Sequence, residues 1–174
     1  MRKATPFLVL GLAVAAVVSC NNDVTGLEPP SDPASETFDP ALGVNIATMT
    51  KTQYGVWIQD VTVGSGAQDS SITDSMTITY VGHLKTGAQF DAGTGVTFNV
   101  KLLVPGMSDG LLGTKEGGKR KIVIPSALGY GAQAVRDTSG AVKIPRQSTL
   151  VFDVDLTKVF QHVDSTNTTS LRKP

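Results

Sequence analysis

Two segments of this chain alternate apolar and polar residues with the two-residue period of a β-strand, and this pattern constrains the fold most. They run from Ser75 to Leu84 and from Ser148 to Val159. One face of each is apolar and is predicted to lie in a core: Met76, Ile78 and Tyr80, then Leu150, Phe152, Val154 and Leu156. The other face of the second segment is half polar and is predicted to be wet: Val151, Asp153, Asp155 and Thr157. Such two-faced strands are typical of an antiparallel sheet with a core on one side.

Shorter β-rich segments and one candidate helix complete the pattern. The further strand candidates are residues 54–63, 88–91, 96–101 and 119–124. Residues 105–113 open with Pro105, which suits a first helical turn, and Met107 and Leu111 share one helical face. We predict an α+β fold in which an antiparallel sheet of about five strands wraps one short helix.

The first twenty residues have the plan of a secretory leader. Arg2 and Lys3 precede an apolar stretch over residues 6–18, which is too short to span a membrane, and Cys20 closes it. Val17-Val18-Ser19-Cys20 resembles the lipobox of bacterial lipoproteins. That resemblance implies a signal peptide over residues 1–19, lipidation of the Cys20 sulfur and a place in the cell envelope. Asn21 favours the outer membrane by analogy with known sorting rules, and the alternative is an ordinary secreted protein with a stray cysteine.

The predicted mature chain is long enough for one domain with a real core. Residues 20–40 are interpreted as the lipidated cysteine and a flexible linker, because Pro, Ser, Asp and Glu dominate residues 21–40. The domain is placed at residues 41–160, and residues 161–174 are predicted to be a disordered polar tail. Without a long helical arm before the domain, a monomer is expected.

Charge and composition exclude several classes of function. The net charge is zero, so no basic balance points to nucleic acid, and the basic run at residues 119–121 is interpreted as a solvated strand face. The two histidines, His83 and His162, lie far apart without a cysteine partner, so no metal site is predicted. With one cysteine there is no internal disulfide, and stability must come from packing.

Six short motifs occur in the order found in the FKBP-type peptidyl-prolyl isomerases, over residues 53–160. They begin with Thr79-Tyr80-Val81-Gly82-His83-Leu84 and Gly87-Ala88-Gln89-Phe90-Asp91. The others are Val104-Pro105-Gly106 with Gly110-Leu111, residues 115–120, Ile124-Pro125-Ser126-Ala127-Leu128-Gly129-Tyr130-Gly131, and Ile144-Pro145 with residues 149–154. The resemblance implies an FKBP-like antiparallel sheet of five to six strands curled around one short helix. It also implies an enzyme that needs no cofactor.

Carrying the family's pocket onto this sequence gives ten residues. The resemblance assigns catalytic roles to Tyr80, Asp91, Tyr130 and Phe152, and substrate binding to Phe90, Phe98, Leu103, Val104, Met107 and Ile144. Aromatic walls would grip a proline ring above Met107, Tyr130 would donate its hydroxyl to a substrate carbonyl, and Ile144 would offer a backbone amide. Asp91 would polarise one rim and hydrogen-bond Tyr80 or the substrate backbone.

The implied substrates are proline-containing segments of exported proteins, whose X–Pro bonds rotate faster in an apolar pocket. The chain departs from the family at Met107, where Trp is frequent, and this leaves the affinity for macrolide inhibitors open. The segment from Tyr130 to Ile144 is longer than usual and carries Arg136, Asp137 and Lys143. The alternative functions are a chaperone or binding module with little turnover, and a purely structural lipoprotein.

Overall fold

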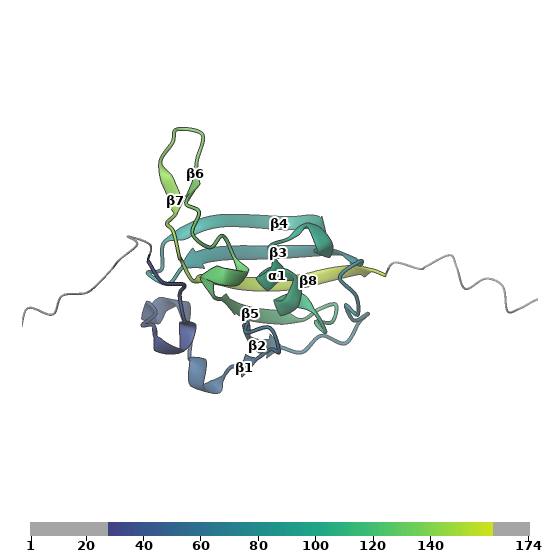
Figure 1. The fold of residues 1–174 in the computed structure, drawn as a ribbon. Coiled ribbons are helices and arrows are strands. Elements are labelled where there is room, and N and C mark those ends of the chain that lie inside the picture. Colours follow the sequence, from purple (N-terminus) through teal and green to yellow (C-terminus); the bar gives the residue numbers. More distant parts are fainter. Residues whose placement is uncertain (1–27, 162–174) are drawn as a thin grey trace, which may run out of the picture.

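A six-stranded antiparallel sheet is the central feature of the computed structural model, which describes residues 28–161. Its strand order is β1-β2-β5-β8-β3-β4, and each neighbouring pair is antiparallel. The strands are β1 (Thr50–Lys51), β2 (Trp57–Thr62), β3 (Ser75–Leu84), β4 (Gln89–Asn99), β5 (Lys119–Ile124) and β8 (Leu150–Phe160). The sheet curves over α1 (Pro105–Leu111), the one α-helix within residues 28–161, and a separate hairpin of β6 (Val135–Arg136) and β7 (Val142–Ile144) stands away from it (Figure 1). The predicted α+β fold, an antiparallel sheet curled around a short helix, is confirmed.

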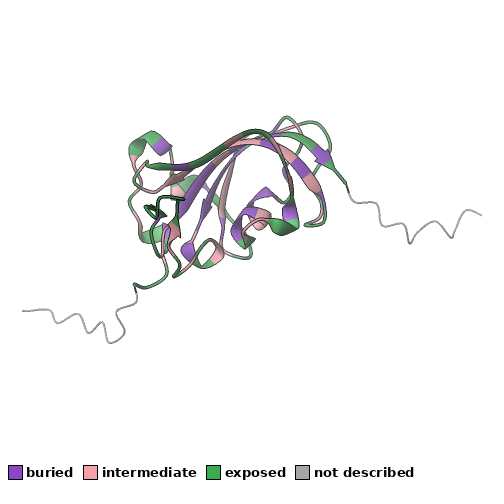
Figure 2. Cartoon of the chain, turned by 90° about the horizontal axis from the view of Figure 1, so that it is seen from above, coloured by how far each residue is buried: buried purple, intermediate pink, exposed green. Residues whose placement is uncertain are grey.

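The two alternating segments form adjacent central strands, β3 and β8. Met76 of β3 and Leu156 of β8 are buried in one core cluster, as their alternation predicts. Figure 2 shows buried residues, in purple, alternating with intermediate and exposed ones along the curved strands. The α1 helix lies close to β5, because a Cβ atom on Gly106 would be 2.2 Å from the Cγ2 atom of Ile124. Glycine at this crossing therefore lets helix and strand approach closely.

Of the basic run on β5, Lys119 is exposed as predicted, whereas Arg120 and Lys121 are buried, contrary to the prediction of a solvated face. Arg120 is buried and donates hydrogen bonds to the carbonyl oxygens of Gly110 and Leu112, at the end of α1. Its guanidinium also pairs with both carboxylate oxygens of Asp60. A buried charge needs such partners, so Arg120 joins the helix end to β2 and β5.

The half-polar face of β8 is also not wholly exposed to water, because the N-terminal segment, residues 28–49, covers part of it. Val151 is fully buried in a second, smaller core with Leu42, Met49 and Val123. This segment contains three short 3-10 helices: η1 (Pro33–Ser35), η2 (Pro40–Leu42) and η3 (Ile46–Thr48). The alternation of β8 is therefore a poor guide at Val151, since apolar residues distant in sequence remove it from water.

The expected flexible linker differs from the structure over residues 28–40. Pro33 is buried, the Lys85 ammonium pairs with Glu36 at 2.8 Å, and the Asp39 N–H donates to the Lys85 carbonyl. These contacts fix residues 33–39 against the domain, although their composition predicts a flexible linker. The predicted leader, the Cys20 lipidation site and residues 21–27 of the linker lie outside the described residues, as does the tail from residue 162. Within residues 28–161, no helix is long and apolar enough to cross a membrane.

Candidate active site

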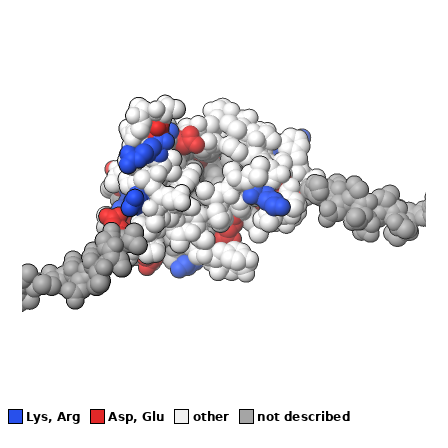
Figure 3. Space-filling view, turned by 45° about the horizontal axis from the view of Figure 1, so that its top comes forward, with Lys and Arg blue, Asp and Glu red and all other residues white. Residues whose placement is uncertain are grey.

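A hollow of about 360 Å3 opens between the inner face of the sheet and the segment that leads into α1. Two short helices precede segments that line it: η4 (Val100–Leu102) comes before α1, and η5 (Ser126–Leu128) comes before Tyr130. Its lining is mostly apolar: Ile78, Tyr80, Asp91, Phe98, Leu102, Leu103, Val104, Met107, Tyr130 and Phe152. The space-filling view shows a hollowed and largely uncharged face, with lysines and arginines mainly towards its margins (Figure 3). Such a site suits an apolar ligand with few polar groups.

Three aromatic rings form the wall on the sheet side. The Tyr80 ring meets Phe98 edge-on with centroids 5.9 Å apart, and lies 6.3 Å from Phe152. Behind the wall, Phe90 supports Phe152 at 5.5 Å in a T-shaped contact. Edge-to-face packing holds these rings in fixed orientations. The wall is therefore preorganised for a flat apolar ring.

Gly82 makes room for this aromatic packing. It lies on β3 opposite Asp91 of β4 and Phe152 of β8. A Cβ atom there would be 2.7 Å from the Cζ atom of Phe90 and 2.8 Å from the Cε1 atom of Phe152. Both distances are too short for carbon atoms, so any side chain at position 82 would displace the rings.

The polar groups of the hollow are two tyrosine hydroxyls and one carboxylate. The Tyr80 hydroxyl donates a hydrogen bond of 2.9 Å to Oδ2 of Asp91. Burial, and then the hydrogen bond to Asp91, raise the pKa of Tyr80 to about 12. Burial, and then the Asp91 charge, also raise the pKa of Tyr130. Both phenols are therefore protonated donors near neutral pH, and among the described residues the Tyr130 hydroxyl has no hydrogen-bond partner.

Eight of the ten residues expected in the pocket line the hollow. Phe90 and Ile144 do not: both are buried in the surrounding core, Ile144 on β7 beside Val135 of β6. Sequence reasoning missed Ile78 and Leu102 as lining residues. Ile78 had a signal in its place two residues before Tyr80 on the apolar face, whereas the 84% exposed Leu102 had none.

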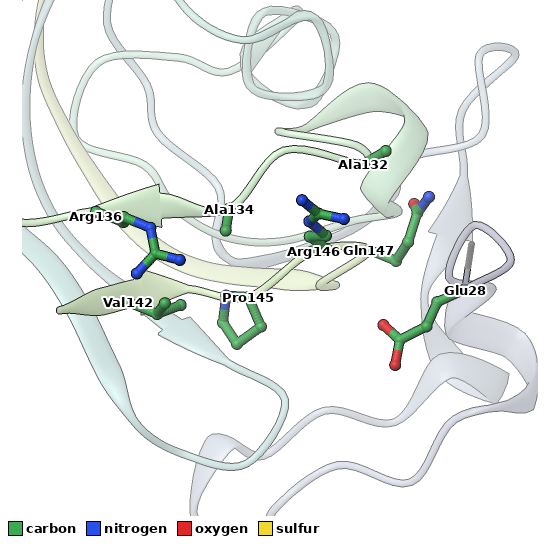
Figure 4. Close-up of a pocket in the computed structure, with 8 residues that line it drawn as sticks. All are labelled: Glu28, Ala132, Ala134, Arg136, Val142, Pro145, Arg146 and Gln147. Carbon is green, nitrogen blue, oxygen red and sulfur yellow. The ribbon is translucent and has the colours of Figure 1, made fainter. Parts of the chain in front are cut away.

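The long segment after Tyr130 forms the β6–β7 hairpin, which borders another hollow of about 430 Å3 (Figure 4). Arg136 and Val142 lie at the hairpin end of it, and Glu28 of the N-terminal segment lies at the other end. Pro145 and Arg146 lie between them. Three of its lining side chains are charged, so this hollow places charged groups beside the loop that carries Tyr130.

The curled antiparallel sheet, the short α1 helix beneath it and the apolar aromatic hollow define the class of protein. The family model for FKBP-type peptidyl-prolyl cis-trans isomerases matches residues 66–157. The FK506-binding protein of Neisseria meningitidis serogroup B is 37% identical over 113 residues, which cover 62% of this chain and 98% of that protein. The Escherichia coli K12 isomerase FkpA is 38% identical over 109 residues, covering 60% of this chain and 38% of that protein.

Solved structures agree with these sequence matches. The crystal structure of a peptidyl-prolyl cis-trans isomerase from Pseudomonas syringae pv. tomato has a TM-score of 0.59 at 28% identity, covering 65% of this chain and 81% of that one. The FkpA structure has a TM-score of 0.56 at 35% identity, covering 64% of this chain and 51% of that one. The chain belongs to the FKBP-type peptidyl-prolyl cis-trans isomerase family.

Proposed function

We propose that this protein catalyses cis–trans rotation of X–Pro bonds by binding the proline ring in the aromatic hollow. The observation that carries the proposal is the preorganised wall of Tyr80, Phe98 and Phe152 above the buried Met107, with two phenol donors at its edge. Rotation makes and breaks no covalent bond, so the reaction needs no nucleophile. What it needs is a site that binds the twisted amide better than the planar one.

Amide resonance explains why an apolar hollow is suited to this task. The planar X–Pro amide is polar and resists rotation by about 18–20 kcal/mol. Halfway through rotation the resonance is lost, so the carbonyl is less polarised and the group fits apolar surroundings better. A thousandfold acceleration needs only about 4 kcal/mol of preferential binding. Exclusion of water by the rings and by Met107 is expected to supply much of this difference.

The polar groups orient the substrate. Tyr130 is a protonated hydroxyl with no partner among the described residues, so it is free to donate to a substrate carbonyl beside the proline. Asp91 accepts from Tyr80 through one oxygen, and its second oxygen is left for a backbone N–H of the substrate. The Tyr80–Asp91 hydrogen bond thereby keeps the carboxylate at the rim of the hollow.

The proposed substrates are proline-containing segments of exported proteins, and the proposed location is the cell envelope, with a lipid on Cys20 and a preference for the outer membrane. The leader pattern of residues 1–20 supports this part of the proposal. A monomer is proposed because the domain carries its own core.

The test is cis-to-trans isomerisation of short X–Pro peptides by the protein without its leader, with the residue before proline varied. Acceleration that disappears in a folded Phe152→Ala variant would support catalysis in this hollow. A folded protein that accelerates no peptide would favour the alternative, an FKBP-fold chaperone or binding module. Met107, where the family often has Trp, is the observation that keeps this alternative in view.

A further inference from the structure

A second apolar hollow, of about 450 Å3, lies beside the proline-binding hollow and has no part in the mechanism above. Its apolar lining residues come from four separate segments: Tyr54, Ile72, Leu103, Pro105, Leu112 and Leu128. Two of its polar side chains are already used within the fold. The Ser108 hydroxyl donates to the Val100 carbonyl, and Asp109 accepts from the Thr52 hydroxyl at 2.5 Å. The hollow therefore offers mainly apolar surface to a ligand.

One short stretch of chain, residues 101–105, separates the two hollows and lines both. Leu103 lines both of them. Next to it, Leu102 and Val104 line only the proline-binding hollow, whereas Lys101 and Pro105 line only the second one. This stretch is a ridge between two binding surfaces, and a polypeptide lying across it would contact both.

Exposed hydrophobic side chains gather at these two hollows. Leu102 on the ridge is 84% exposed, and in the second hollow Tyr54 and Ile72 are 66% and 51% exposed. Leu112 and Tyr130, also exposed, line the second hollow and the first one respectively. Single exposed hydrophobic residues are common on proteins, whereas a cluster of them marks a binding surface.

We propose that the second hollow binds an apolar side chain of the same polypeptide whose proline occupies the aromatic hollow. This inference rests on the proposed isomerase function and adds a requirement on the substrate. The preferred substrate carries a large apolar residue within a few residues of its proline, because an extended chain advances about 3.3–3.6 Å per residue and the hollows share a wall. Unfolded polypeptides supply such residues.

The experiment measures peptide affinity by fluorescence anisotropy, so that it does not depend on turnover. Labelled ten-residue peptides contain one proline and one leucine, placed two to five residues before or after it, with serine and glycine elsewhere. We expect leucine to tighten binding about 5- to 10-fold at positions on one side of the proline, relative to the same peptide with glycine. In the Tyr54→Ser/Ile72→Ser variant this gain should fall below twofold.

Val61→Ser is the matched control, because Val61 is 61% exposed and lines neither hollow. This variant should retain the full leucine gain, and thermal unfolding should show that all three proteins are folded. The inference is overturned if leucine gives no gain at any position, or if the double variant keeps the gain. If the protein does not accelerate isomerisation of short peptides, that result counts against the isomerase proposal. The anisotropy measurements still decide whether the second hollow binds an apolar side chain.

Discussion

Ser31 and Ser126 exchange two hydrogen bonds across 95 residues of sequence. The Ser31 N–H donates to the Ser126 hydroxyl at 2.8 Å, and the Ser126 N–H donates to the Ser31 hydroxyl at 2.7 Å. Ser126 is fully buried; its hydroxyl donates to Gln147, and its carbonyl accepts the Gly131 N–H. The N-terminal segment is therefore joined to the base of the loop that carries Tyr130.

Replacing Ser31 with alanine should therefore affect both stability and catalysis. The Ser126 N–H would be left buried without an acceptor, which costs about 1–3 kcal/mol. We expect urea unfolding to show that loss, and peptide isomerisation to show a raised KM through misplacement of Tyr130. Ser35→Ala is the control, since the Ser35 hydroxyl makes only an exposed bond within η1. Equal unfolding midpoints for the two variants would contradict the prediction.

The Tyr80–Asp91 pair is expected to matter for turnover more than for folding. Tyr80→Phe and Asp91→Ala each remove the hydrogen bond at an exposed rim, so each should cost at most about 1 kcal/mol of stability. We expect kcat/KM for an X–Pro peptide to fall about tenfold in each variant, and the double variant to lose less than the product of the two. If neither turnover nor the binding of unfolded polypeptide substrates changes, this hollow is not the active site.

Gly82→Ala tests the aromatic packing. The added methyl group would meet Phe90 and Phe152 at less than 3 Å, so the rings must shift, at a cost of about 1–3 kcal/mol. Isomerase activity should fall with the loss of the wall, and near-ultraviolet circular dichroism should report the disturbed aromatic side chains. Val81→Ala, one residue away, is the control and should leave that spectrum intact.

The buried Asp69 should make the stability of the protein fall as the pH rises towards neutrality. It is fully buried, and burial, followed by the nearby charge of Asp74, raises its pKa from 3.8 to about 7. Between about pH 4 and 7 the folded protein holds a proton that the unfolded chain has lost. The proton held by Asp69 therefore contributes fully to the free energy of unfolding below pH 4. From pH 4 to pH 7 this contribution declines by at most about 1.4 kcal/mol per pH unit.

Asp69→Asn should remove that decline, because asparagine stays neutral throughout the range. Urea unfolding midpoints at pH 5 and pH 8 would measure it for both proteins. The control is Asp155→Asn, an exposed carboxylate that pairs with Lys119. If the wild-type and Asp69→Asn proteins differ by the same amount at both pH values, Asp69 does not titrate in this window.

Much of the fold and the hollow could be predicted from the residues alone. The period of β3 and β8 identified the core side at Met76 and Leu156, and Pro105 marked the start of α1. The resemblance of the motifs to the FKBP family implied eight residues that line the hollow. Phe90 and Ile144 could not be told from lining residues, because one packs behind Phe152 and the other lies within the core. Contact with a cavity depends on neighbours from other strands.

The sequence by itself determined the strand faces and the helix, because these follow from local periodicity. It also carried the motifs whose resemblance to the FKBP family implied the chemistry of the pocket. Only the tertiary structure decided what lies on the outer face of the sheet. Val151 is buried there and Ser31 braces the active-site loop, because residues 28–49 pack against strands that follow far later in the chain. Tertiary structure likewise buries Arg120, whose carbonyl and carboxylate partners come from α1 and β2. No local pattern encodes such contacts, since each needs two distant segments to meet.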